Sequence, residues 1–165
     1  MNPDHAKFLT ETLGQQLQTE WMTTYKVIEA IPEGKKDWKP EPVARTAWEL
    51  AQHLAVADVG FLHAVIANDF TNTFPGKTTA TTARQLADWY KHEMPKALEQ
   101  VLALDGAHMS KIVEFYGMKL PSASYVLFCL THMIHHRGQL ATYLRPMGGK
   151  VPSIYGGSAD EPYKG

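Results

Sequence analysis

The sequence has a single cysteine, no long apolar run and no marked charge of either sign, and each of these absences excludes a class of protein. Cys129 alone cannot form a disulfide within the chain, so we expect no disulfide-stabilised scaffold and a location in the reducing cytoplasm. Lys and Arg number 16 and Asp and Glu 17, which gives a formal net charge of −1. The sequence contains no run of basic residues, so we expect no nucleic-acid partner. We also expect no membrane span, because no stretch of about 18 apolar residues stands out, and no secretory signal in MNPDHAKFL.

What the sequence does contain is apolar residues spaced three and four apart over four long segments, which predicts an all-α fold. The predicted helices cover about 3–31, 46–68, 82–104 and 121–145, within a single domain over residues 1–165. The links after the first and third helices are about 15 residues long, and that length permits crossover connections. We therefore predict a four-helix bundle with crossover connections.

Local signals add detail to this outline. Thr46 followed by Glu49 matches the capping-box pattern at the start of the second helix. Pro95 predicts a kink in the third helix or a break near Glu93. The segment 108–121 is predicted to be extended or irregular, and the Gly- and Pro-rich tail after Arg145 to be coil.

The last predicted helix carries a narrow stripe of coordinating and hydrogen-bonding side chains. At about 100° per residue the stripe spans roughly 80° and contains Tyr125, Cys129, His132, His136, Gln139 and Tyr143. Because His132 and His136 are one turn apart, both rings can face a single ion. Pairing His132 with His135 is also geometrically possible. We prefer His136, because Gln139 and Tyr143 then continue the stripe as candidate hydrogen-bond partners of a metal-binding histidine.

A third histidine lies in the middle of the second predicted helix. The face around His53 is lined mostly by small residues: Glu49, Ala57, Gly60 and Ala64. These either let another segment approach closely or leave room for an ion and a small molecule, and Glu49 is a candidate orienting group. If the second and fourth helices are neighbours, His53, His132 and His136 converge. Three imidazoles suit Zn²⁺ with one position open, and imidazole also suits Ni²⁺, Cu²⁺ and Fe²⁺.

The sequence also bears on other kinds of histidine site. A zincin requires Glu directly after the first histidine, where this chain has Met133. A di-iron bundle requires Glu-x-x-His, whereas Glu49 and His53 are four apart. Cys129 as a fourth ligand would make the site a closed, structural one, although a buried cysteine usually behaves as a small apolar residue. Histidines that are hydrogen-bonded in the core without any metal are the remaining alternative.

The segments WELAQHL and HMIHHRGQLATYLR and the ending GGKVPSIYG resemble the DinB family, which includes YfiT-like metal-dependent proteins. The resemblance spans nearly the whole chain. It implies a four-helix bundle, typically of crossover order, with divalent-metal ligands at His53, His132 and His136. It also implies zinc or nickel as the ion and a homodimer as the assembly.

Some members of the family use low-molecular-weight thiols in transferase or isomerase reactions. The resemblance therefore implies a metal-dependent thiol transferase or hydrolase acting on a small molecule. The alternative is a non-catalytic, stress-associated metal-binding bundle. No residue of the sequence selects among these activities, so whether the protein is an enzyme is left open at this stage.

Overall fold

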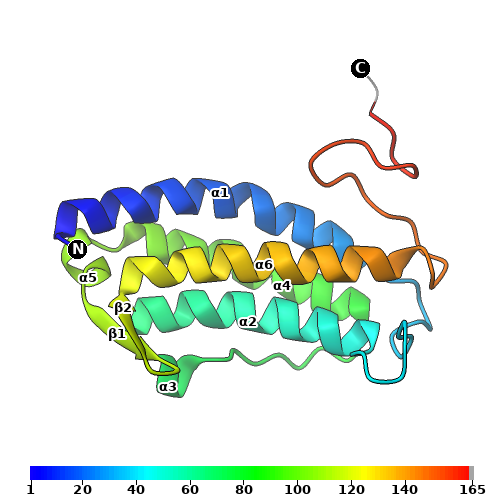
Figure 1. Ribbon diagram of the computed structural model, residues 1–165, viewed down its shortest axis with the longest axis horizontal. Helices are drawn as coiled ribbons and strands as arrows, with labels where there is room; N and C mark the ends of the chain where they lie inside the picture. Colours follow the sequence, from blue (N-terminus) through cyan, green and yellow to red (C-terminus); the bar gives the residue numbers. More distant parts are fainter. Residues whose placement is uncertain (164–165) are drawn as a thin grey trace.

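The computed structural model describes residues 1–163 of the chain, in which four long helices pack side by side (Figure 1). They are α1 (Pro3–Glu29), α2 (Ala47–Ala67), α4 (Ala83–Ala103) and α6 (Ser122–Leu144). The predicted bundle is confirmed, and each helix ends within two residues of its predicted bounds. Periodic apolar spacing combined with strong caps explains this accuracy. The Asn2 side chain accepts from the N–H of His5, and Thr46 and Glu49 form the predicted capping box.

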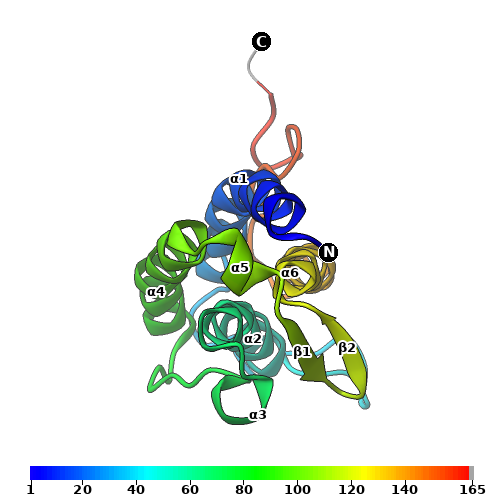
Figure 2. The same ribbon diagram turned by 90° about the vertical axis from the view of Figure 1, so that its left-hand side faces the viewer.

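The helices are connected by crossovers. Seen from one end, α1 lies diagonally opposite α2, and α4 lies diagonally opposite α6 (Figure 2). Each helix therefore packs on the two helices of the other diagonal, so that α2 contacts both α4 and α6. The link between α2 and α4 returns along the length of the bundle (Figure 1). This order makes α2 and α6 neighbours, which is the condition for His53 to meet the histidines of α6.

Helix α2 is the most apolar part of the core. Contrary to the expectation from sequence, its length and its mean hydropathy of 1.5 over 18 residues would be enough to cross a membrane. However, 67% of that window is buried inside the bundle, and core helices commonly pass the same test. The burial accounts for the composition of α2 without a lipid environment.

Short elements gather at one end of the bundle, where α2 and α4 end and α6 begins (Figure 1). Helices α3 (Phe70–Thr73) and α5 (Gly106–Met109) follow the long helices α2 and α4. The segment predicted as extended contains an antiparallel hairpin of β1 (Ile112–Phe115) and β2 (Met118–Pro121). Its turn needs positive φ at two positions, +48° at Tyr116 and +80° at Gly117.

Two further predictions can be checked. The break near Glu93 does not occur, because α4 continues through Pro95 to Ala103. The tail after α6 is coil, as predicted, up to residue 163; residues 164 and 165 lie outside the described part of the chain.

A buried arginine sets the orientation of α6 against α1. Arg137 is 1% exposed and donates to the Glu20 carboxylate and, at 2.6 Å, to the hydroxyl of Tyr155 in the tail. A buried charge is tolerated where such partners surround it. Because Arg137 faces α1, the preceding residue, His136, is turned toward α2.

Candidate metal centre

The structure brings the three predicted histidines together across the seam between α2 and α6. His53 Nε2 lies 3.1 Å from His136 Nε2 and 3.2 Å from His132 Nε2. All three ligand atoms lie within 4.8 Å of one another, and we call these three residues the histidine cluster. The neighbouring His135 is exposed and packs its ring against His136 from outside the cluster.

These separations fit a single divalent ion. Two ligands at the Zn–N distance of 2.0–2.1 Å and a tetrahedral angle would lie about 3.3 Å apart. The two measured Nε2–Nε2 separations, 3.1 and 3.2 Å, are close to that value. Three nitrogens on two helices also leave one tetrahedral position free. The donor set therefore fits a divalent ion with an open coordination site.

A buried carboxylate orients His132. Asp58 on α2 is fully buried; its Oδ1 lies 2.8 Å from His132 Nδ1, and its Oδ2 accepts from the Tyr90 hydroxyl at 3.0 Å. Since a carboxylate oxygen accepts, the proton of His132 is assigned to Nδ1, which leaves a lone pair on Nε2. Carboxylate partners of this kind hold metal-binding histidines in the required tautomer.

His136 is oriented in the same way by a neighbour on its own helix. Its Nδ1 lies 2.7 Å from the side-chain oxygen of Gln139, so Nδ1 donates and Nε2 faces the cluster. Gln139 is thus the partner that the stripe predicted. Glu49 differs from its expected role: its carboxylate accepts from the N–H of Thr46 in the capping box, and no hydrogen bond to His53 is found among residues 1–163.

Two residues of the predicted stripe, Cys129 and Tyr125, have structural roles outside the cluster. The Cys129 thiol is buried and donates to the backbone oxygen of Asp58 at 3.5 Å, and it does not join the metal-binding group found among the described residues. The Tyr125 hydroxyl donates to the backbone oxygens of Val113 and Met118, which ties the hairpin to α6. Neither side chain closes the open position of the cluster.

The electrostatic environment keeps the cluster uncharged. Burial lowers the pKa of His53, His132 and His136 from the ordinary 6.5 to about 4, and the positive charge of Arg45 acts in the same direction on all three. Burial also raises the pKa of Asp58, an effect opposed by its Tyr90 hydrogen bond. Neutral imidazoles are the form that binds metals, so few protons would compete for the site at pH 7.

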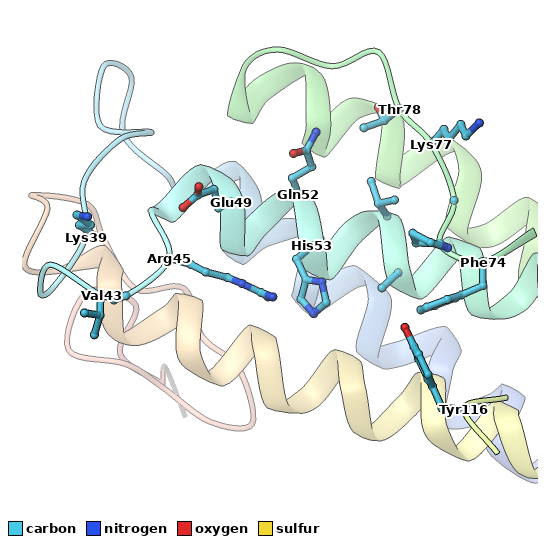
Figure 3. A pocket seen from close by; sticks show the side chains of 15 residues that line it. Lys39, Val43, Arg45, Glu49, Gln52, His53, Phe74, Lys77, Thr78 and Tyr116 are labelled. Carbon is cyan, nitrogen blue, oxygen red and sulfur yellow. The ribbon is translucent and has the colours of Figure 1, made fainter. Parts of the chain in front are cut away.

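His53 lines a large cavity that opens to the surface. The cavity has a volume of about 1020 Å³ and lies between α2, the segment 39–45 before it, the returning link at 74–78, and the hairpin turn. Figure 3 shows the His53 imidazole pointing into it, with Arg45 on one side and Tyr116 on the other. An open cavity beside the cluster gives a small molecule access to the site.

The small-residue face of α2 serves both purposes that the sequence allowed. Ala57 lines the cavity, one turn from His53. Gly60 lies against the Pro75–Gly76 backbone of the returning link, where a Cβ would overlap the nitrogen of Gly76. The missing side chain lets the link, rather than another helix, lie close to α2 and form one wall of the cavity.

Asp58 is the residue of the candidate site that the sequence analysis did not identify. It stands in AVADVGF, in the most apolar part of α2. An ionisable side chain within such a run is almost never buried without a partner. That signal could have identified Asp58 as the partner of a residue on another helix, although not which one.

Comparisons with known proteins agree with this architecture. The profile of the DinB family matches residues 3–163. Two proteins of Bacillus subtilis (strain 168), each named as uncharacterized, are similar in sequence. YrdA is 29% identical over 121 residues, which is 72% of this chain and 69% of that protein. YjoA is 27% identical over 127 residues, 76% of this chain and 82% of that protein.

Solved structures show the same fold. A DinB-like protein from Bacillus cereus superposes with a TM-score of 0.73 at 23% identity, covering 88% of this chain and 97% of that one. The crystal structure of the DinB-like YjoA gives a TM-score of 0.72 at 20% identity, covering 87% and 97%. Because the family profile spans nearly the whole chain and these structures share its fold, the protein belongs to the DinB family.

Proposed function

We propose that the protein binds a divalent metal ion, zinc or nickel, through the Nε2 atoms of His53, His132 and His136. Three features of the cluster support this. The nitrogens are spaced as ligands of one ion, the hydrogen bonds of Asp58 and Gln139 leave lone pairs facing inward, and burial keeps the rings neutral.

We further propose that the centre acts on a small molecule, as a metal-dependent thiol transferase or hydrolase. The observation that carries this is the cavity of about 1020 Å³ reaching His53, since a sealed centre would have favoured a purely structural ion. A bound divalent ion would supply Lewis-acid chemistry, lowering the pKa of a coordinated water or thiol. Asp58 and Gln139 would hold the ligand rings, and Phe61, whose ring centroid is 5.6 Å from that of His132, would limit water on the buried side.

Metal analysis of two histidine variants tests the first proposal. Protein purified without a His-tag or chelating resin should contain close to one equivalent of metal. His136→Ala should lose the metal together with any turnover, because it removes a ligand. His135→Ala, one residue away and exposed, is the matched control and should keep both. Full metal occupancy in His136→Ala would refute the assignment.

Assembly and location complete the proposal. The DinB resemblance implies a homodimer, and the lone buried Cys129 suits the reducing cytoplasm. Light scattering on the purified protein measures the assembly directly, and a monomer at micromolar concentration would refute the homodimer.

A further inference from the structure

The cavity beside the histidine cluster carries an excess of positive charge. Its charged lining residues are Lys39, Arg45, Lys77 and Glu49. The one carboxylate, Glu49, already accepts the N–H of Thr46 at 2.8 Å in the capping box. Positive groups around a concave site attract anions more strongly than they would on a flat surface. The lining therefore favours a negatively charged occupant.

Arg45 stands out among the arginines of the chain. Arg84, Arg137 and Arg145 each pair with a carboxylate. Arg45 is exposed, and within residues 1–163 its guanidinium has no hydrogen bond or ion pair to another side chain. A guanidinium presents several N–H donors in a planar fork that matches carboxylate and phosphate groups. The donors of Arg45 are thus available to a ligand.

The position of Arg45 relates this charge to the centre. Figure 3 shows its side chain extending along the cavity with the guanidinium directed at the His53 ring. Its charge acts on all three cluster histidines, which places it within electrostatic range of the whole cluster. A small molecule with one atom at the open position of the cluster would have its next few atoms beside Arg45.

From this arrangement we infer that Arg45 is a specificity-determining residue, which selects small molecules carrying a carboxylate or phosphate group a few atoms from the group that meets the metal. The inference rests on the proposed function, because it assumes that the cluster holds an ion. Arg45 binds and orients the anionic end, and Lys39 and Lys77 add a less directed attraction at the cavity walls.

A series of thiols tests the charge preference. Cobalt(II)-loaded protein is titrated with 3-mercaptopropionate, 2-mercaptoethanol and cysteamine, which carry negative, neutral and positive groups on the same two-carbon spacer. The thiolate-to-cobalt absorption band gives each dissociation constant. We expect 3-mercaptopropionate to bind at least about tenfold more tightly than 2-mercaptoethanol, and cysteamine to bind most weakly. Cysteamine is the most acidic of the three thiols, so acidity alone would give the opposite order.

Two matched variants isolate Arg45. Arg45→Gln should reduce the preference for 3-mercaptopropionate, so that the ratio of the dissociation constants of 2-mercaptoethanol and 3-mercaptopropionate falls toward one. Arg84→Gln makes the same change of charge outside the cavity and should leave this ratio unchanged. Added salt should weaken the wild-type preference, because an exposed charge is screened. An equal preference in wild type and Arg45→Gln would overturn the inference while leaving the metal centre standing.

A second probe separates failure of the inference from failure of the proposed function. If none of the thiols produces the band, the thiol chemistry is refuted, and the anion site is then judged with inorganic phosphate. Phosphate should raise the unfolding temperature of cobalt-loaded wild type and Arg84→Gln more than that of Arg45→Gln, since binding to the native state stabilises it. Equal shifts in all three proteins would overturn the role of Arg45.

Discussion

Replacing Asp58 by Asn tests whether the buried carboxylate controls the metal centre. The change keeps the size of the side chain and removes its charge. Asp58 now accepts from His132 Nδ1 at 2.8 Å and from the Tyr90 hydroxyl at 3.0 Å. In the variant, the amide oxygen still accepts from His132 and the NH₂ group faces the Tyr90 hydroxyl, which leaves one N–H of the amide and the hydroxyl hydrogen of Tyr90 without an acceptor.

The expected losses follow from these contacts. Carboxylate partners of metal-binding histidines typically contribute 10- to 100-fold to metal affinity, or about 1.4–2.8 kcal/mol. We therefore expect Asp58→Asn to bind zinc about 10- to 100-fold more weakly. Each unpaired buried donor costs about 1–3 kcal/mol, so the metal-free variant should be less stable by roughly 2–6 kcal/mol.

Competition with a chelator of known zinc affinity measures the dissociation constant, and circular dichroism at the same temperature confirms that the variant is folded. Asp88→Asn is the matched control, because Asp88 on α4 is 58% exposed and belongs to a surface ion pair. It should bind zinc as tightly as wild type. An affinity of Asp58→Asn within twofold of wild type would refute the view that the charge of the Asp58 carboxylate strengthens metal binding through His132.

Two further predictions concern stability. The cluster histidines have a folded pKa of about 4 and an unfolded value of 6.5, so the unfolded chain binds more protons between these values and stability falls as the pH drops through them. His132, with 16% of its side chain exposed, should account for a loss of about 2 kcal/mol of folding stability when the pH falls from 7 to 5, and each of the other two histidines for a smaller loss. Urea unfolding of the metal-free protein measures this, and equal midpoints at the two pH values would contradict it. Gly60→Ala should cost about 1–3 kcal/mol, because its Cβ would overlap the backbone of Gly76. At Gly138 an added Cβ meets nothing within 4 Å, so Gly138→Ala should stabilise α6 by about 0.5–1 kcal/mol. Thermal unfolding of both variants tests these expectations. Similar shifts in the two unfolding temperatures would count against the packing of Gly60 on the link.

Local patterns were enough to predict the helices but not how they are arranged. The first residues of α2 could be located because Thr46 and Glu49 form an N-terminal capping box whose spacing is visible in the sequence. Of the two predictions from Pro95, a kink or a break near Glu93, the break is wrong because a proline removes one hydrogen bond and strains one turn, which the packing of α4 against α1 and α2 can offset. Link lengths permitted crossovers, but only tertiary packing placed α2 beside α6.

The same distinction holds for the site: features within one helix could be predicted from sequence, and contacts between helices could not. His132 and His136 could be paired from sequence because they share one helix face, and Gln139 followed from the same stripe. The meeting of these rings with His53 depended on an assumed helix neighbourhood. Asp58 was missed because its partners, His132 and Tyr90, lie on two other helices. Contacts between residues distant in the chain leave no periodic signal.

The distance along the chain between the cluster residues has a consequence for folding. His53 and His136 are 83 residues apart, so an ion held by both would cross-link two antiparallel helices and close a long loop. Unlike a disulfide, the ion would leave when the chain unfolds, so it would stabilise the folded state through its binding free energy and not by restricting the unfolded chain. In a protein with one cysteine, the ion would thus link two helices that no internal disulfide can join. Amide hydrogen exchange along the α2–α6 seam should then slow most when metal is added.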